Sequence, residues 1–294
     1  MPIIIDGKAT AAKIVEEIKK DVITISENIH RKTILALLLV GEDPASQIYV
    51  RSKSKRCEET GIESIVLKKD ASTSEEEVLD IIQSWNSDDT IDGILVQLPL
   101  PKHINESKVL YNISPKKDVD GFHPENVGRL VAGLPTFIPC TPMGIYELLK
   151  RYEINLNGKH CVVLGRSNIV GKPIANLLYQ KNPNANAIVT ICHTGAKDLS
   201  YYTKQADVLI AAMGVPELIK ANDIKDGAVI IDVGINRIPD PNTAKGYRVV
   251  GDVDYNDVIN KVSAITPVPG GVGPMTISML LLNTLRSAKK EIYK

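Results

Sequence analysis

Residues 161–173, Cys161-Val-Val-Leu-Gly165-Arg-Ser-Asn-Ile-Val-Gly171-Lys-Pro173, predict a buried strand that runs through a glycine turn into the start of a helix. Gly165 can adopt backbone angles that other residues avoid, which suits a sharp turn after a strand. Pro173 suits a first helical turn. Because such a helix start presents unpaired N–H groups and a positive dipole, we expect this junction to be a candidate phosphate site.

The spacing of the two glycines matches neither common nucleotide motif. Five residues separate Gly165 from Gly171, whereas the Rossmann fingerprint is G-x-G-x-x-G, and a P-loop has four residues between its glycines. Two interpretations of the loop alone therefore stay open, an ordinary strand-to-helix turn of a parallel sheet and a nucleotide-binding turn.

The next apolar run favours a nucleotide, and NADP over NAD. Residues 187–192 lead into His193-Thr194-Gly195, where an NAD enzyme usually carries an acid for the ribose hydroxyls, and no acid is present. Arg166, Thr194 and Lys197 instead offer positive charge and hydrogen bonds to a 2′-phosphate.

Length, charge and cysteine usage limit the class of protein. The 294 residues suffice for two domains, and 35 basic side chains balance 35 acidic ones, so we expect a small-molecule ligand and no nucleic-acid or membrane partner. The four cysteines lack metal-site spacing, which argues against zinc and against a disulfide framework. No charged leader and no membrane-length apolar run occur, so a cytoplasmic protein is predicted.

Apolar runs alternate with helix-like segments in two regions, which predicts an α/β fold with two parallel-sheet domains flanking a cleft. In the first region the runs are 34–40, 65–67 and 91–96, and the helices are Pro44 to Thr60 and one opened by the capping box Ser74…Glu77. In the second the runs are 161–164, 187–192, 208–212, 228–233 and 264–266. We place the first domain at 1–145, with a helix within 275–294 packing back on it, and a Rossmann-like domain at 146–274.

Polar or glycine residues follow these runs at the points where the strands are predicted to end. Ligands of open parallel sheets bind at this carboxyl edge, so two such edges facing each other would form a binding cleft. The residues concerned are Gly41, Gln97, Gly165, Thr194, Gly214 and Gly234.

Tyr49 and Lys53 are expected one turn apart on one face of the helix from Pro44 to Thr60, so they can reach a common point. The surrounding basic residues favour an alternative, a solvated helix face, when the pair is considered alone. Gln97 and Asp120 follow the third strand of the first domain and offer hydrogen-bond donors and acceptors. A strand-end amide and a turn acid are equally good interpretations of these two residues.

The segment Thr266-Pro-Val-Pro-Gly-Gly-Val-Gly-Pro-Met-Thr276 combines three prolines with three glycines. The prolines stiffen it, and Gly270, Gly271 and Gly273 leave room for a flat ligand to approach the backbone closely. We therefore favour a binding loop over a plain turn between domains. We take Pro269, Gly270 and Gly271 as candidate substrate contacts.

Together these segments resemble the bifunctional methylenetetrahydrofolate dehydrogenase/cyclohydrolase family over most of the chain. Seven blocks occur in the family's order, namely Tyr49-Val-Arg-Ser-Lys53, Gly93-Ile-Leu-Val-Gln-Leu-Pro-Leu-Pro101, Lys117-Asp-Val-Asp-Gly121, Pro139-Cys-Thr-Pro142, Gly165-Arg-Ser-Asn-Ile-Val-Gly171, Asp232-Val-Gly-Ile-Asn236 and Pro267-Val-Pro-Gly-Gly-Val-Gly-Pro-Met-Thr276.

The resemblance implies a homodimer formed through the nucleotide domains, with folate held mainly by the first domain and NADP by the second. It implies that Lys53 is the catalytic base, Tyr49 packs on the folate, Gln97 supports the lysine and Asp120 anchors the pterin. It further implies nucleotide contacts from Gly165, Arg166, Ser167, Thr194 and Ile235. Thr194 replaces the serine that is more usual in the family and keeps the hydroxyl.

The implied activity has two steps, oxidation of 5,10-methylenetetrahydrofolate with NADP and hydrolysis of the methenyl product to 10-formyltetrahydrofolate. The first step needs orientation of substrate and cofactor rather than an acid. The second needs a base, and a lysine can serve when a neighbouring positive charge, such as a cationic substrate, favours the neutral amine.

Three alternatives remain at this stage. The first is a monofunctional dehydrogenase of the same family, without the hydrolytic step. The second is a two-domain nicotinamide-dependent dehydrogenase for another substrate, such as shikimate or an amino acid, which we expect to lack the Gln97 and Asp120 segments. The third is a nucleotide-binding sensor without turnover.

Overall fold

The computed structural model describes residues 1–243 and 246–293. The chain forms two compact units, unit 1 with Met1–Ala11 and Thr141–Thr276, and unit 2 with Ala12–Cys140 and Ile277–Lys294. The expected division began the first domain at residue 1. The structure differs because β1 (Ile3–Ile4) pairs in parallel with β11 (Ala264–Ile265), which places Met1–Ala11 in unit 1. The cleft that we expect between the two domains depends on the placement of one unit relative to the other, and it stays a prediction.

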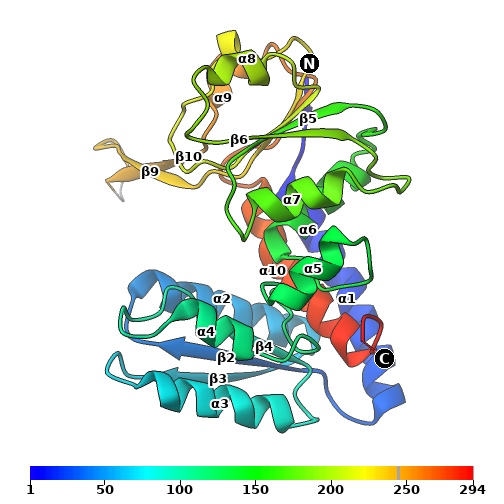
Figure 1. Cartoon of the computed structure of the whole chain (residues 1–294), viewed down its shortest axis with the longest axis vertical. Coiled ribbons are helices and arrows are strands. Elements are labelled where there is room, and N and C mark those ends of the chain that lie inside the picture. Colours follow the sequence, from blue (N-terminus) through cyan, green and yellow to red (C-terminus); the bar gives the residue numbers. More distant parts are fainter. Residues whose placement is uncertain (244–245, 294) are drawn as a thin grey trace. The chain divides into compact units, whose positions relative to one another are not determined.

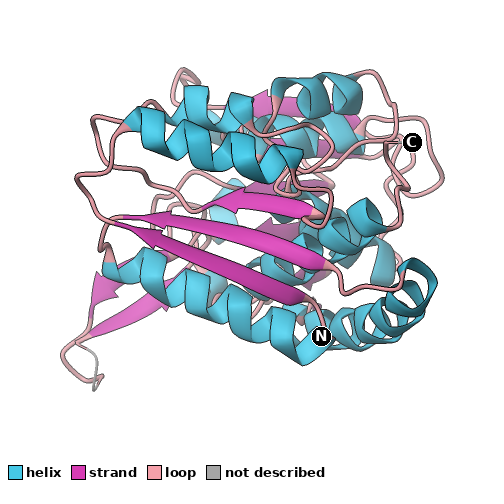
Figure 2. Ribbon diagram, turned by 90° about the horizontal axis from the view of Figure 1, so that it is seen from below, coloured by secondary structure: helices cyan, strands magenta, loops and turns pink. Residues whose placement is uncertain are grey.

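Unit 2 contains a parallel three-stranded sheet in the order β3-β2-β4, with β2 at Ile34–Val40, β3 at Glu63–Lys69 and β4 at Gly93–Val96. Leu35 to Val40 are all buried, as the near-continuous apolar run predicts for a central strand covered on both faces. Figure 2 shows the strands side by side, with helices on either side of the sheet.

The helices of unit 2 begin and end where short-range signals place them. In α2 (Pro44–Thr60), the Asp43 carboxylate accepts from Ser46 N at 2.7 Å, and Gly61 ends the helix at φ +83°. In α3 (Glu75–Ser87), the Ser74 hydroxyl accepts from Glu77 N at 3.1 Å. The helix from Pro44 to Thr60 and the helix start at Ser74 are confirmed, and so is the parallel α/β fold.

Further helices lie wholly or partly among the described residues of unit 2. α4 (Glu106–Asn112) packs with α3 on one face of the sheet, where Val78, Ile82 and Val109 join the core of Ala36 and Leu38. α5 (Pro124–Val131) follows, and the later part of α1 (Gly7–Ile29) also belongs here. Most of α10 (Val272–Ala288) lies in unit 2, where the Asn283 amide donates to the carbonyls of Val119 and Ile138 at 2.9 and 3.0 Å.

Unit 1 contains a parallel six-stranded sheet in the order β1-β11-β8-β7-β5-β6, with β5 at His160–Leu164, β6 at Ile188–Cys192, β7 at Val208–Ala211 and β8 at Val229–Asp232. The expected runs are confirmed as strands to within two residues at each end. Their cores are apolar, since Val162, Leu209 and Ile230 are all fully buried.

Unit 1 contains several further short elements besides the strands of this sheet. They are α6 (Cys140–Arg151), α7 (Gly171–Leu178), α8 (Leu199–Thr203), a 3₁₀ turn (Ala221–Asp223) and α9 (Tyr255–Val258). Strands β9 (Asn236–Pro239) and β10 (Tyr247–Val250) pair antiparallel as a hairpin that stands out from the sheet (Figure 1). Among the described residues, no helix is long and apolar enough to span a membrane.

Candidate functional site

The carboxyl edge of the unit 1 sheet gathers the loops that the sequence singled out. In the register of the sheet, Leu164 at the end of β5 is paired with Cys192 at the end of β6 and with Ala211 at the end of β7. Ala211 is in turn paired with Asp232 at the end of β8. The residues that follow these four strand ends therefore line one edge, which is where open parallel sheets bind ligands.

The Gly165 turn is packed too tightly for any other residue. Gly165 has φ +112°, and a Cβ on it would collide with the carbonyl oxygen of Ala212. A Cβ on Gly171 would likewise collide with the carbonyl oxygen of Gly165. The spacing of five residues between these glycines thus serves close packing of the turn on the helix start.

One expectation for this turn is wrong. The first N–H groups of α7 were expected to be unpaired, but Val170 N and Gly171 N donate to the Ser167 hydroxyl oxygen at 3.1 and 3.2 Å. Lys172 N donates to the Ser167 carbonyl at 3.0 Å. Ser167 thus satisfies the helix start itself, and its hydroxyl hydrogen is what remains to donate to a ligand.

We expect Gly165→Ala to destabilise the protein by about 3 kcal/mol or more, because both the strained φ and the collision act against it. Gly158→Ala is the matched control, since Gly158 also has a positive φ of +68° but has no neighbour within 4 Å of an added Cβ. It should cost about 1 kcal/mol. Chemical denaturation of both variants measures the difference, and equal losses would show that the packing of Gly165 on Ala212 is unimportant.

The predicted nucleotide residues of unit 1 are exposed around this edge. Arg166 and Thr194 are both exposed and follow neighbouring strands, and no described residue forms an ion pair with the Arg166 guanidinium. Ile235 follows β8 and is 60% exposed, which is unusual for a large apolar side chain. Free positive charge and an exposed apolar side chain at one sheet edge fit a phosphorylated dinucleotide.

The proline- and glycine-rich loop of unit 1 shares a cavity with Ile235. This cavity of about 140 Å³ is lined by Asp232 to Ile235 and by residues 267–274, which include Pro269, Gly270 and Gly271. Gly270 has φ +112°, and its carbonyl accepts from Lys8 N at 2.9 Å, so the loop is fixed in place. The structure thus brings predicted substrate and cofactor residues of unit 1 together.

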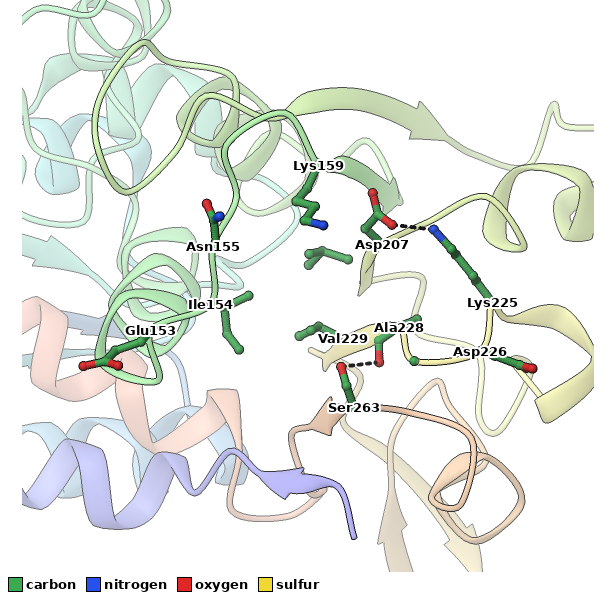
Figure 3. Close-up of a pocket in the computed structure, with 12 residues that line it drawn as sticks. Glu153, Ile154, Asn155, Lys159, Asp207, Lys225, Asp226, Ala228, Val229 and Ser263 are labelled. Atoms are coloured by element: carbon green, nitrogen blue, oxygen red, sulfur yellow. Dashed lines mark hydrogen bonds and ion pairs between the residues drawn. The ribbon is translucent and has the colours of Figure 1, made fainter.

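A second cavity of unit 1, of about 380 Å³, lies at the opposite edge of the sheet (Figure 3). It is lined by Val208 and Val229, the first residues of β7 and β8, and by Lys159 and Ser263, which precede β5 and β11. Two of the charged side chains that line this cavity form an ion pair with each other, since Lys225 Nζ lies 2.5 Å from Asp207 Oδ1. Position at the amino edge argues against this cavity as the nucleotide site.

Unit 2 holds the predicted base. Tyr49 and Lys53 lie one turn apart on α2, Tyr49 half exposed and Lys53 partly buried. Lys53 Nζ donates to Gln97 Oε1 at 3.0 Å, and Gln97 Nε2 donates to the Leu98 carbonyl at 2.7 Å. The backbone amide of Gln97 is held by the Leu38 carbonyl of β2. A fixed amide thus orients the lysine, which the alternative of a freely solvated helix face does not predict.

Asp120 completes this cluster. Burial raises the pKa of Asp120, while the Lys53 charge and a hydrogen bond from the Cys140 thiol act to lower it. The Cys140 thiol also lies 3.6 Å from the Val119 carbonyl, and its pKa is raised well above its usual value by burial and by Asp120. Sequence reasoning missed Cys140, because a cysteine 20 positions away carries no local signal of pairing with this acid.

Asp118 has a different role from Asp120. It is buried, and its carboxylate accepts from Phe122 N, His123 N and Asn126 Nδ2 at 3.3, 2.8 and 2.8 Å. These bonds close the turn that carries Asp120. Asp120 is therefore the stronger candidate of the two acids, because the carboxylate oxygens of Asp118 already accept hydrogen bonds within the turn.

The cysteines form no disulfide and belong to no metal-binding group within residues 1–243 and 246–293. The four cysteines are free and buried, and burial raises the pKa of Cys57 and of Cys161 to about 12. Over the same residues no group of three potential metal ligands occurs.

Comparison with known proteins supports the resemblance over nearly the whole chain. Residues 5–120 match the family model "Tetrahydrofolate dehydrogenase/cyclohydrolase, catalytic domain", and residues 139–292 match "Tetrahydrofolate dehydrogenase/cyclohydrolase, NAD(P)-binding domain". The chain is 56% identical to the bifunctional protein FolD of Chloroherpeton thalassium, over 97% of this chain and 98% of that protein.

Solved structures agree. The bifunctional enzyme FolD from Campylobacter jejuni has a TM-score of 0.93 and 50% identity, and the match covers 99% of this chain and 100% of that one. A Trypanosoma brucei N5,N10-methylenetetrahydrofolate dehydrogenase-cyclohydrolase, solved with NADP cofactor and inhibitor, has a TM-score of 0.92 and 36% identity, with 100% and 99% of the two chains covered.

Proposed function

The chain belongs to the tetrahydrofolate dehydrogenase/cyclohydrolase family, and we propose that it oxidises 5,10-methylenetetrahydrofolate with NADP and then hydrolyses the methenyl product to 10-formyltetrahydrofolate. The observation that carries the second activity is the 3.0 Å hydrogen bond from Lys53 Nζ to the fixed amide of Gln97, beside the partly buried Asp120. This arrangement is what a base needs if it is to act at one defined point.

NADP would be held by unit 1, at the carboxyl edge of its sheet. Arg166 and Thr194 would bind the 2′-phosphate of NADP. Gly165 and Ser167 would contact the sugar-phosphate part of the nucleotide, and Ile235 would pack against one of its flat rings. When bound, NADP supplies the acceptor for the hydride that leaves the methylene carbon. The chain's own part in this step is to hold both molecules in register, so no acid is required.

Hydrolysis would use the unit 2 cluster. Water adds to the methenyl carbon, and the amine of Lys53 takes a proton from that water, which leaves a neutral carbinolamine. The bond from this carbon to N5 then breaks: N5 takes a proton, which the Lys53 ammonium can return, and the hydroxyl gives up its proton as the C=O of the formyl group forms on N10. One proton is released to solvent in the whole step. Gln97 orients the lysine, Tyr49 packs against the folate, and Asp120 anchors the pterin.

Pro269, which is exposed, and Gly270, which is partly buried, would offer the backbone of the proline- and glycine-rich loop of unit 1 to the substrate. Gly271 is buried against Thr266 and Pro267 and would support the loop from beneath.

We further propose that the protein is a homodimer formed through unit 1 and acts in the cytoplasm, in one-carbon metabolism. The folate and nucleotide are its partners in this account, without a resident metal, nucleic acid or membrane. Size-exclusion chromatography with light scattering measures the assembly, and a monomer at micromolar concentration would contradict the dimer.

Product analysis of the purified chain tests the proposed function. With 5,10-methylenetetrahydrofolate and NADP, we expect NADPH to form, followed by 10-formyltetrahydrofolate above the rate of uncatalysed hydrolysis. NADPH with only methenyl product would show a monofunctional dehydrogenase. Nucleotide binding without any product would contradict the enzyme and support a sensor.

A further inference from the structure

Two carboxylates are buried together beneath the nucleotide edge of unit 1. Asp232, the last residue of β8, is 4% exposed, and Asp252, which follows β10, is 0% exposed. Burial of a carboxylate is unfavourable unless hydrogen bonds compensate, so the donors around this pair indicate what the pair is for.

The donors come from the loops that end β7 and β8. Asp252 Oδ2 accepts from Met213 N and Gly214 N at 2.6 and 2.9 Å, and Asp252 Oδ1 accepts from Asn236 Nδ2 at 2.9 Å. Asp232 Oδ1 accepts from Gly234 N at 3.0 Å. Both loops therefore donate hydrogen bonds to the same pair of carboxylates.

The two acids are also tied to each other. Asp232 accepts from the backbone N–H groups of Asp252 and Val253, both at 2.9 Å. A Cβ on Gly234 would collide with the Asp252 carboxylate, and a Cβ on Gly251 would collide with that of Asp232. These two glycines are therefore required by the close approach of the acids and leave little room for the network to move.

Ile235 sits between the two held residues. Its neighbour Gly234 is bound to Asp232 and its neighbour Asn236 to Asp252, yet its own side chain is 60% exposed. That side chain borders the cavity shared with Pro269 and Gly270. A rigid polar support on both sides thus presents an apolar side chain to a ligand.

We propose that Asp252 is a positioning residue for the nucleotide, holding Gly214 and Asn236, and through them Ile235, in the conformation that receives NADP. This role rests on the proposed function, because it assumes that the carboxyl edge binds NADP. Asp252 lies beneath the loops and acts through them rather than on the reacting atoms.

Asp252→Asn tests the proposal. The asparagine amide has the size of the carboxylate, but its NH2 group replaces one of the two accepting oxygens and faces N–H donors there. At least one of the hydrogen bonds that hold the two loops is therefore lost. We expect the Kd and KM for NADP to rise about 10-fold or more, with a smaller change in kcat. Hydrolysis of added methenyltetrahydrofolate, which needs no NADP, should stay within about twofold of the wild-type rate and reports on the fold.

Asp254→Asn is the matched control. Asp254 lies two residues away and caps α9 by accepting from Asp257 N at 3.3 Å, outside the network. It should leave NADP binding unchanged. If Asp252→Asn fails to fold, Asn236→Ala removes one donor to Asp252 and should weaken NADP binding in the same direction.

The outcomes separate this role from the proposed function. Wild-type NADP binding together with unchanged binding by Asp252→Asn, or by Asn236→Ala where that variant is used, would overturn the positioning role alone. Equal losses of NADP binding and of hydrolysis would also overturn it, since they indicate a general structural role. A wild-type chain that binds no NADP would overturn the proposed function and this role with it.

Discussion

Replacing Arg166 by alanine should weaken NADP binding about 10- to 100-fold and change NAD binding less than about threefold. Arg166 is exposed beside the end of β5, and none of the described residues neutralises its guanidinium. The Arg166 guanidinium can therefore form an ion pair and two parallel hydrogen bonds with the 2′-phosphate of NADP. NAD has no phosphate at that position. Binding titrations with both nucleotides measure the two affinities.

Lys204→Ala is the control for this prediction. Lys204 is an exposed cation that follows α8 in the same unit, so its removal changes the charge of unit 1 by the same amount. It should alter neither affinity by more than about twofold, because exposed charges act weakly over distance in salt. Equal losses of NADP and NAD affinity in Arg166→Ala would show that this arginine does not recognise the 2′-phosphate.

The parts of the fold that local signals specify were predictable. The helix α2 is set by Asp43, Pro44 and Gly61, all of which act within one turn of its ends. The apolar run of β2 is long enough to predict a central strand, and its neighbours follow from β/α alternation. A parallel sheet places the carboxyl ends of all its strands at one edge. The candidate nucleotide residues, which follow those ends, could therefore be predicted to lie at the same edge.

Elements that depend on distant partners were not predictable in the same way. β1 has only two residues, and it is a strand because Ile3 and Ile4 pair with β11 some 260 positions away in the chain. The β9–β10 hairpin likewise lacks a strong local pattern. Each of its strands has only four residues, and partly buried residues alternate with exposed ones along most of their length, so neither strand forms a long apolar run. These pairings are long-range, and periodicity carries little information about them.

The candidate site shows the same division. The contact of Lys53 with Gln97 agrees with the support of the lysine that the family resemblance implied, whereas the positions of these residues on a helix and after a strand had left other interpretations open. The capping of α7 by Ser167 was missed, since glycine spacing does not reveal which hydroxyl competes for the N–H groups. The Asp232–Asp252 pair was missed because its members lie 20 residues apart and meet only in the fold.

Replacing Lys53 by methionine should lower hydrolysis of methenyltetrahydrofolate by about 100-fold or more and leave hydride transfer within about 10-fold of wild type. Methionine keeps an unbranched side chain of similar length on α2 but has no amine to take a proton from water. The hydride step depends on the orientation of substrate and cofactor and needs no base. The two rates are measured separately, as NADPH formation and as loss of methenyl substrate.

Lys55→Met controls for the loss of a lysine on the same helix. Lys55 is exposed two residues along α2, and no described residue pairs with its amine. Both activities should stay within about twofold of wild type in this variant. If Lys55→Met lost hydrolysis to the same extent as Lys53→Met, the effect would belong to the charge of the helix face rather than to the Lys53–Gln97 pair.

The central claim is that the Lys53 amine is the base for hydrolysis. The most direct test supplies methenyltetrahydrofolate without NADP and follows its conversion to 10-formyltetrahydrofolate by wild type, by Lys53→Met and by buffer alone. We predict that wild type is far faster than buffer and that Lys53→Met is close to buffer. Conversion by Lys53→Met at the wild-type rate would contradict the account.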